Sequence, residues 1–137
     1  MRLFVSLSLL LLNSYAFGHP RGEDFQVFCP RFFCDSTFQS GRISFPLITV
    51  RYSPGFEKVD TLYTIAEHWQ FSTFGFWGTN VPDNYHVQIY DNFAQTLRDS
   101  SERVVAFEGM ENGIRVSLFF RLVENKWFLV KIEDFST

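Results

Sequence analysis

Two side chains in one segment have the types and spacing that acid–base chemistry uses. His86 and Tyr90 lie four residues apart in the segment Tyr85–Tyr90, whose alternation predicts a strand. On a strand they face the same side, together with Gln88. A histidine titrates near neutral pH, so the pair suits proton transfer if both residues line a cavity. The sequence favours the plainer interpretation, in which they form the solvated side of a strand.

A second cluster is formed by Glu67, His68 and Trp69. His68 beside a carboxylate could serve as a base or a metal ligand. The ordinary interpretation is a helical turn that Trp69 anchors to the core while its neighbours face water. A metal site would need His68 and His86 to converge with a carboxylate, without any local ligand spacing to help. The sequence therefore predicts no metal site, no cofactor and no catalytic triad.

Arg42 is the charged residue with the most informative position. It follows Gly41 and leads into the apolar segment 43–52, seven residues after Asp35. The interpretation that the sequence favours has Asp35 capping a short helix and Arg42 pairing with it or with terminal carbonyls. The alternative places Arg42 at the mouth of a pocket, where its planar guanidinium would bind an anionic ligand.

Aromatic residues are the compositional anomaly, with 18 phenylalanines in 137 residues. So many rings exceed what a thin core holds, which indicates a sheet that is apolar on both faces, a lined cavity or a subunit interface. In the Gly-rich segment 74–82, Trp77 and its aromatic neighbours could form a lid or pack back as a plug. The candidate ligand-binding residues are Arg42, His86, Tyr90 and Trp77.

The N-terminus has the layout of a secretory signal peptide. Arg2 precedes an apolar run over residues 3–12, and small residues follow. The run is shorter than the roughly 20 residues that span a bilayer, and no cysteine follows it for lipid attachment. We expect cleavage near residues 16–18, which removes the signal peptide (1–18). Residues 19–137 then form a single exported domain, periplasmic or secreted, without a membrane anchor.

Charge and cysteine usage narrow the partners and the chemistry. The formal charge is −3 and no basic stripe is present, which argues against nucleic acid. Cys29 and Cys34 are the only cysteines. Their Cα atoms in an unbroken helix lie beyond the about 7 Å limit for a bridge, so a disulfide needs a break near Pro30. The sequence favours two reduced thiols.

Predicted helices precede predicted strands. Apolar positions from Phe25 to Phe32 have helical spacing behind the capping residue Asp24, although Pro30 predicts a kink or a new start within them. A short second helix over residues 37–40 follows. Strands are expected at residues 43–52, 59–65, 85–90, 103–108, 114–123 and 127–132. Pro46 confines the first strand to a sheet edge or a strand start. This order is typical of an α+β fold, with the N-terminal helices packed on an antiparallel sheet.

Alternation along the last strands predicts which face of the sheet is buried. Leu118 and Phe120 share a wholly apolar face, which belongs under the helices, whereas Phe119 and Arg121 share a mixed face. In the final strand, the alternation sets Trp127, Leu129 and Lys131 against Phe128, Val130 and Ile132. A semi-apolar outer face with Phe119, Arg121 and Trp127 could be a homodimer interface.

The same residues resemble a known family. The resemblance rests on Phe25, Phe28, Phe32, Asp35, Phe38-Gln39, Arg42-Ile43, Phe45-Pro46-Leu47 and the strands with Trp127. This pattern, over residues 24–132, is similar to a family of exported proteins from Bacteroides and its relatives. That family is a branch of the nuclear transport factor two-like superfamily, whose cone-shaped α+β fold curls a sheet around helices. The resemblance implies this fold, a pocket inside it and an exported location, and it transfers no activity.

The resemblance places the default site between the helices and the concave face of the curved sheet. Enzymes of the superfamily, such as ketosteroid isomerase and scytalone dehydratase, place an Asp or His base and a Tyr donor there, and no such motif maps onto this chain. The sequence favours a non-enzymatic module that binds an apolar or amphipathic small molecule or a protein. The alternatives are a pocket enzyme using His86 and Tyr90 for proton transfer or dehydration, and a dimerising interaction module.

Overall fold

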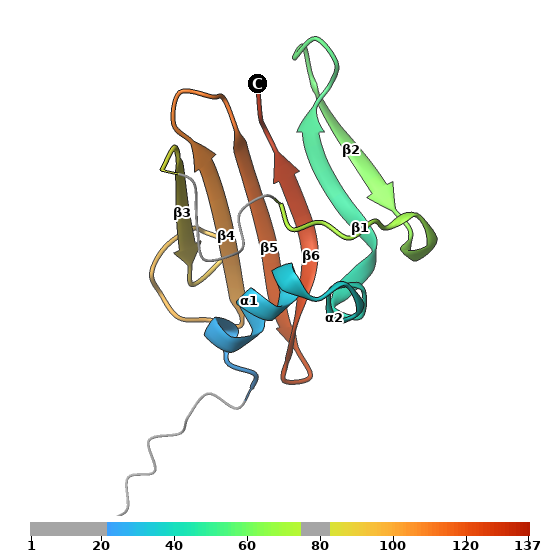
Figure 1. The fold of residues 1–137 in the computed structure, drawn as a ribbon, viewed down its shortest axis with the longest axis vertical. Helices are drawn as coiled ribbons and strands as arrows, with labels where there is room; N and C mark the ends of the chain where they lie inside the picture. Colours follow the sequence, from blue (N-terminus) through green and yellow to red (C-terminus); the bar gives the residue numbers. More distant parts are fainter. Residues whose placement is uncertain (1–21, 75–82) are drawn as a thin grey trace, which may run out of the picture.

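Two short helices lie across one face of a six-stranded sheet (Figure 1). The computed structural model describes residues 22–74 and 83–137. The helices are α1 (Phe25–Cys34) and α2 (Ser36–Ser40). The strands are β1 (Ile43–Tyr52), β2 (Val59–Thr64), β3 (Tyr85–Tyr90), β4 (Glu102–Gly109), β5 (Arg115–Val123) and β6 (Lys126–Asp134), with a 3-10 turn η1 (Ala66–His68) after β2. The predicted signal peptide and Trp77 lie outside the described residues.

The strands follow the order β2-β1-β6-β5-β4-β3. Neighbouring strands are antiparallel except β1 and β6, which are parallel. The predicted strands are confirmed, but the prediction of an antiparallel sheet is wrong at β1 and β6, which run parallel. The alternative that put the first strand at a sheet edge is also wrong, because β1 lies between β2 and β6. Pro46 is tolerated there because pairing with β2 begins only at Leu47 and the register with β6 shifts between Ile43 and Ile48.

Helix α1 runs without a break through Pro30, so the predicted new start at that residue is wrong. Asp24 caps the helix, accepting a hydrogen bond from the backbone N–H of Gln26 at 2.8 Å. Pro30 is exposed, and the carbonyl of Gln26 that loses its helical donor belongs to another exposed residue, so water can replace the missing bond. Cys29 is buried and Cys34 is exposed, and both thiols are free. Burial raises the pKa of the Cys29 thiol to about 12.

Phe120 of β5 stands at the centre of the core. Its ring centroid lies 5.4, 5.5 and 5.2 Å from those of Phe25, Phe28 and Phe32 on α1, each in an edge-on or T-shaped arrangement. Phe28, Phe32 and Phe120 are at most 1% exposed. The prediction that the apolar face of β5 packs under the helices is confirmed. These rings fill the centre of the layer between α1 and the sheet.

A β-bulge in β6 changes the side-chain alternation along that strand. Phe119 of β5 pairs with Lys131, whereas the next residue, Phe120, pairs with Leu129, so Val130 has no direct partner. An extra residue in one strand shifts its alternation by one position. Strict alternation would assign the side chains before the bulge and those after it to opposite faces. The extra residue brings both sets to the helix-covered face.

Because of this bulge, the predicted outer surface of Phe119, Arg121 and Trp127 is wrong. Trp127 lies on the helix-covered face, is 3% exposed, and packs its ring 5.1 Å from that of Phe25. On the other face, Phe119 is only 4% exposed, since Phe93 packs on its ring at 5.4 Å and the Lys131 Nζ lies 4.0 Å from the ring centroid. The predicted dimer surface is therefore divided between two faces, and Phe119 is already covered within the chain.

Candidate functional site

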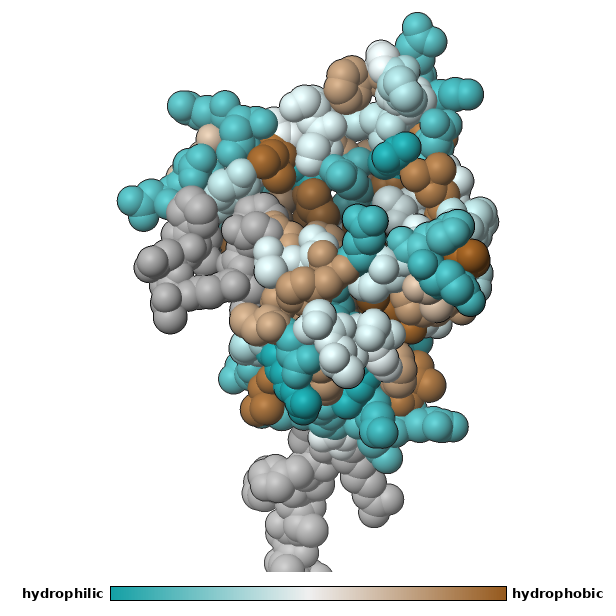
Figure 2. Space-filling model, turned by 45° about the vertical axis from the view of Figure 1, so that its right-hand side comes forward, coloured by the Kyte–Doolittle hydropathy of each residue, from teal (hydrophilic) through white to brown (hydrophobic). Residues whose placement is uncertain are grey.

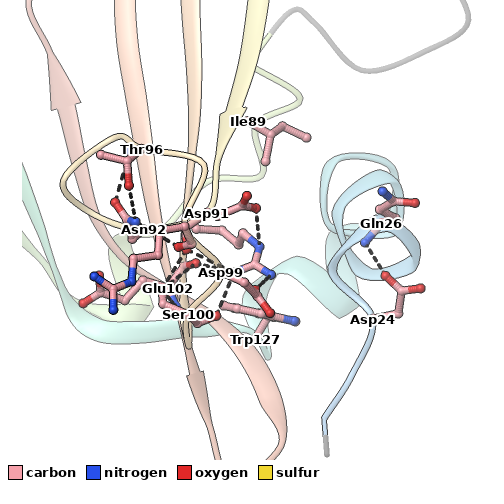
Figure 3. A network of polar contacts seen from close by, with 12 residues as sticks. Asp24, Gln26, Ile89, Asp91, Asn92, Thr96, Asp99, Ser100, Glu102 and Trp127 are labelled. Atoms are coloured by element: carbon pink, nitrogen blue, oxygen red, sulfur yellow. Dashed lines mark hydrogen bonds and ion pairs between the residues drawn. The ribbon is translucent and has the colours of Figure 1, made fainter. Parts of the chain in front are cut away.

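A pocket of about 730 Å³ lies on the helix-covered side of the sheet, between the start of α1 and the loop that joins β3 to β4. Its apolar lining is Phe25, Ile89, Leu122 and Trp127, and its polar lining is Gly22, Glu23, Asp24, Gln26, Asp91, Asp99, Ser100 and Arg103. Figure 3 shows Asp24 and Gln26 on the α1 side and Asp91, Asp99 and Ser100 across from them on the loop. The volume falls within the range of small-molecule sites.

Strand alternation and helix capping position the pocket walls. Ile89, Leu122 and Trp127 come from three strands, and the strand pairing places all of them on the face that α1 covers. Phe25 is the first residue of α1, directly after the capping Asp24. The apolar wall is thus the open end of the phenylalanine core, and the polar rim belongs to the elements that begin or end there.

The loop over residues 91–101 is held by its own polar side chains (Figure 3). The Asn92 side-chain amide donates to the Thr96 hydroxyl at 2.6 Å and to the Arg98 carbonyl at 2.9 Å. The Ser100 hydroxyl donates to the Asp91 carbonyl at 2.7 Å. These bonds replace regular secondary structure, so residues 91–101 form an ordered loop.

Arg103 of β4 places two carboxylates at the rim of the pocket. Its guanidinium lies 2.7 Å from Asp99 and 3.5 Å from Asp91, and it stacks 5.1 Å from the Trp127 ring centroid. Its side chain is only 16% exposed, which favours a paired over an unpaired charge. Since one guanidinium serves two carboxylates, the rim keeps an excess of negative charge.

Glu23 ties the other side of the pocket to the end of β6. Its carboxylate accepts two hydrogen bonds from the Arg42 guanidinium, at 2.6 and 3.0 Å, and one from the Trp127 backbone N–H at 3.1 Å. Its backbone carbonyl accepts a hydrogen bond from the Trp127 indole N–H at 2.7 Å. This bidentate pair anchors the chain just before α1 and leaves the Glu23 carboxylate fully engaged.

The predicted pairing of Arg42 with Asp35 is wrong. Asp35 does cap α2, as predicted, by accepting from the Phe38 backbone N–H at 2.9 Å, but its ionic partner is Arg31 at 3.7 Å. Arg42 turns instead toward Glu23, which the sequence places 19 residues away. The Arg42 side chain is only 15% exposed, and Arg42 is not among the residues that line the pocket, so it supports the site without facing it.

Loss of the Glu23 carboxylate is expected to lower the free energy of unfolding most at a pH above the pKa of that carboxyl. Burial acts to raise the pKa of this carboxyl, but hydrogen bonds from Arg42 and Trp127, with the charges of Arg42 and Lys126, hold the pKa below its ordinary value of 4.5. A lowered pKa in the folded state gives stability that is present above pH 4.5 and is lost as the pH falls through the folded pKa.

Glu23→Gln should therefore lower the free energy of unfolding by about 2 kcal/mol at pH 7 and by less near pH 3. Urea unfolding of both proteins across this pH range measures the difference. Exposed Glu124→Gln is the control, with a change within about 0.5 kcal/mol. A Glu23→Gln loss that is the same at every pH would contradict the role given to the ion pair.

His86, Gln88 and Tyr90 lie on the opposite face of the sheet. They line a hollow of about 320 Å³ with residues that include Glu108 and Arg115. His86 is exposed, and its backbone pairs with that of Glu108 on β4. The structure thus brings His86 and Tyr90 into one hollow and separates both from Arg42.

The cluster of residues 67–69 has the predicted plain role. Glu67 and His68 are exposed in η1, while Trp69 is half-buried and donates its indole N–H to the Gln39 side chain at 3.2 Å. Among residues 22–74 and 83–137, no three His, Cys, Asp or Glu side chains are grouped so as to hold a metal ion. Over the same residues, no helix has the length and apolar character needed to cross a membrane.

Sequence patterns did not identify Asp91, Asp99, Arg103 and Trp127 as pocket residues. A signal was available in Asp99 and Arg103, which lie four residues apart at the entry to a predicted strand. Asp91, Asn92 and Ser100 also bracket that segment with residues that fix turns. Nothing local, however, shows that this loop faces the start of α1.

Solved structures with the same fold come from Bacteroides species. An NTF2-like protein from Bacteroides fragilis NCTC 9343 is 27% identical, with a TM-score of 0.63 over 87% of this chain and 50% of that one, so this chain spans half of its length. A cystatin-like protein from Bacteroides caccae ATCC 43185 is 22% identical, with a TM-score of 0.56 over 82% of this chain and 76% of that one. A protein from Bacteroides uniformis ATCC 8492 is 20% identical, with a TM-score of 0.55 over 83% and 78%.

These likenesses confirm the nuclear transport factor two-like fold that the sequence resemblance implied. No curated protein matches the chain. The model of one family, described as a domain of unknown function (DUF4348), matches residues 6–134. Since that match covers nearly the whole sequence, the chain belongs to the DUF4348 family.

Proposed function

We propose that this protein is an exported, non-enzymatic binding module that holds a small amphipathic molecule with a positively charged group. The ligand would occupy the pocket between α1 and the β3–β4 loop. The observation that carries the proposal is the combination, in one pocket of about 730 Å³, of an apolar wall and an acidic rim. The combination matches the general design of ligand sites, in which apolar area gives affinity and a few polar groups set orientation.

The apolar wall accounts for the hydrocarbon part of such a ligand. Phe25, Ile89, Leu122 and Trp127 come from four elements and converge on the pocket. Covering apolar surface of this kind contributes about 25 cal/mol for each Å² removed from water. An alkyl chain or a ring of modest size would therefore bind with useful affinity before any polar contact is made.

The acidic rim accounts for the charge. Asp91 and Asp99 share the single guanidinium of Arg103, so their combined charge is only half neutralised. Asp24 adds a further carboxylate on the facing α1 side. A ligand ammonium group between these carboxylates would gain attraction from both sides, whereas a carboxylate ligand would be repelled.

The carboxylates at the pocket are engaged in structural roles, which favours binding over catalysis. Glu23 pairs with Arg42, Asp24 caps α1, and Asp99 pairs with Arg103. His86 and Tyr90, the residues of the enzyme alternative, line the hollow on the other face. A general base needs a substrate proton within hydrogen-bond reach, and His86 lies across the sheet from this pocket.

Export follows from the sequence pattern of residues 1–18, an apolar run behind one positive charge. Cleavage near residues 16–18 is compatible with the described fold, because the described residues begin at residue 22. Fusion of residues 1–18 to a periplasmic reporter enzyme tests the location. Variants that change Arg2 or the apolar run test which part of the segment is needed.

Octylamine should bind more tightly than octanol, and octanol more tightly than nonanoate. These probes share one alkyl chain and differ in charge, so the order isolates the effect of the rim. We expect about a fivefold difference per step, which is roughly 1 kcal/mol, the scale of one partly exposed charge interaction. Isothermal titration calorimetry at low ionic strength measures it, and added salt should reduce the preference.

Neighbouring substitutions on α1 provide a matched test of position. Gln26→Arg adds a positive charge at the pocket and should weaken octylamine binding, because Gln26 lines the pocket. Val27→Arg adds the same charge one residue along, at a side chain that is 71% exposed and does not line it. Equal effects of the two variants, or tighter binding of nonanoate than of octylamine, would overturn the proposal.

A further inference from the structure

Strand β2 is an open edge of the sheet. Within the described part of the chain, it stands at one end of the strand order and pairs only with β1. Of the 11 large hydrophobic residues that are exposed in the described part of the chain, seven lie between residues 52 and 71, which indicates that this region is unlike the rest of the surface. They are Tyr52, Phe56, Val59, Leu62, Tyr63, Ile65 and Phe71.

Within the described residues, this edge lacks the residue types and the bulges that commonly prevent strand pairing. Natural edge strands carry prolines, lysines, bulges or a covering segment. Here the segment 59–64 contains neither proline nor lysine, and its only charge is Asp60. Its pairing with β1 is regular from Val59 to Thr64. The extended backbone also reaches Ile65, whose φ and ψ are −85° and 161°.

We propose that a second copy of this chain pairs with β2, edge to edge and antiparallel, to form a homodimer. Antiparallel pairing of two identical edges requires a two-fold axis perpendicular to the sheet. This axis keeps the helices of both copies on the same side and joins two six-stranded sheets into one continuous sheet. Because each copy uses its β2 edge on the axis, the contact closes as a dimer and does not continue into a fibre.

Symmetry and charge together select the register. Opposed residues must point to the same face, so the axis passes through a residue of β2. An axis at Asp60 would oppose two carboxylates, and an axis at Thr61 would oppose Asp60 to Leu62. An axis at Leu62 opposes Leu62 to itself, Asp60 to Thr64, Thr61 to Tyr63 and Val59 to Ile65. Only this last register avoids like charges and matches apolar with apolar residues.

The dimer should be of modest strength. Figure 2, in which the β1–β2 side is turned forward, shows apolar side chains in separate small patches among polar ones. Backbone hydrogen bonds along one strand would therefore drive association, with cross-strand side-chain pairs in support. The contact area is small for a permanent dimer, so we expect association to depend on protein concentration.

A pair of oppositely charged variants tests the register directly. Sedimentation equilibrium should show the unmodified chain dimerising over a series from about 10 µM to about 1 mM. Leu62→Lys alone and Leu62→Glu alone should each weaken the dimer by at least about tenfold, because each opposes like charges on the axis. An equimolar mixture of the two should restore dimers. Leu97→Lys, at a loop side chain that is 75% exposed, is the control and should dimerise normally.

Cysteine cross-linking gives a second test with a smaller change. In a Cys34→Ser background, mild oxidation of Leu62→Cys should yield a disulfide-linked dimer, because Leu62 opposes itself. Asp60→Cys should not, because Asp60 opposes Thr64. A chain that stays monomeric throughout the series, a mixture that does not restore dimers, or cross-linking through Asp60→Cys instead of Leu62→Cys would overturn the proposal.

Discussion

Phe120→Ala is expected to lower the free energy of unfolding by about 4 kcal/mol. The Phe120 ring is fully buried and contacts three rings of α1, so truncation leaves a cavity that the helix cannot close without losing its packing on the sheet. A loss of this size is a large part of the stability of a small domain. Urea unfolding followed by far-UV circular dichroism measures it.

Val123→Ala is the matched control on the same strand. Val123 is 45% exposed, and the strand pairing places it on the face opposite Phe120. Its truncation should change the free energy of unfolding by no more than about 0.5 kcal/mol. Similar small losses for both variants would mean that α1 does not pack on the face of β5 that carries Phe120.

Gln39→Leu is expected to lower the free energy of unfolding by about 3 kcal/mol. The Gln39 side chain is fully buried and makes four hydrogen bonds. It donates to the carbonyls of Phe32 and Ser72 at 3.0 and 2.7 Å, and it accepts from the Trp69 indole and the Ser72 backbone N–H, both at 3.2 Å. Leucine has a similar volume but leaves these partners without a bond.

The Gln39→Leu loss should appear in denaturant unfolding and in the fluorescence of Trp69, whose indole N–H loses its acceptor. Gln70→Leu serves as the control, because Gln70 is exposed one residue beyond Trp69. It should leave stability within about 0.5 kcal/mol. If Gln39→Leu were as mild as Gln70→Leu, the segment after β2 would not depend on α2 for its position.

Local patterns account for what the sequence predicted well. The strand at residues 85–90 and the one at residues 43–52 have the predicted bounds, because their ends are marked by turn residues and their interiors by alternation. The face of β5 that carries Phe120 was identified because that strand is regular. The capping roles of Asp24 and Asp35 followed from residue type and position alone.

Features that depend on long-range packing could not be predicted. The bulge at Val130 leaves no mark in the sequence, yet it moves Trp127 to the opposite face from the one that strict alternation assigned. The order of β1 beside β6 joins segments that are far apart in the chain, and so does the pairing of Arg42 with Glu23. The pocket depends on the bulge and on the Arg42–Glu23 pair, because Trp127 and Glu23 belong to its lining.

The position of the Trp127 indole N–H signal in a two-dimensional NMR spectrum, during titration with octylamine, tests the proposed site most directly. Trp127 lines the pocket, and its indole donates to Glu23 at the pocket edge, whereas the Trp69 indole is bonded to Gln39 elsewhere. We predict that the Trp127 signal shifts in a saturable way and that the Trp69 signal stays in place. A Trp127 signal that does not move while octylamine binds would show that the ligand occupies another site.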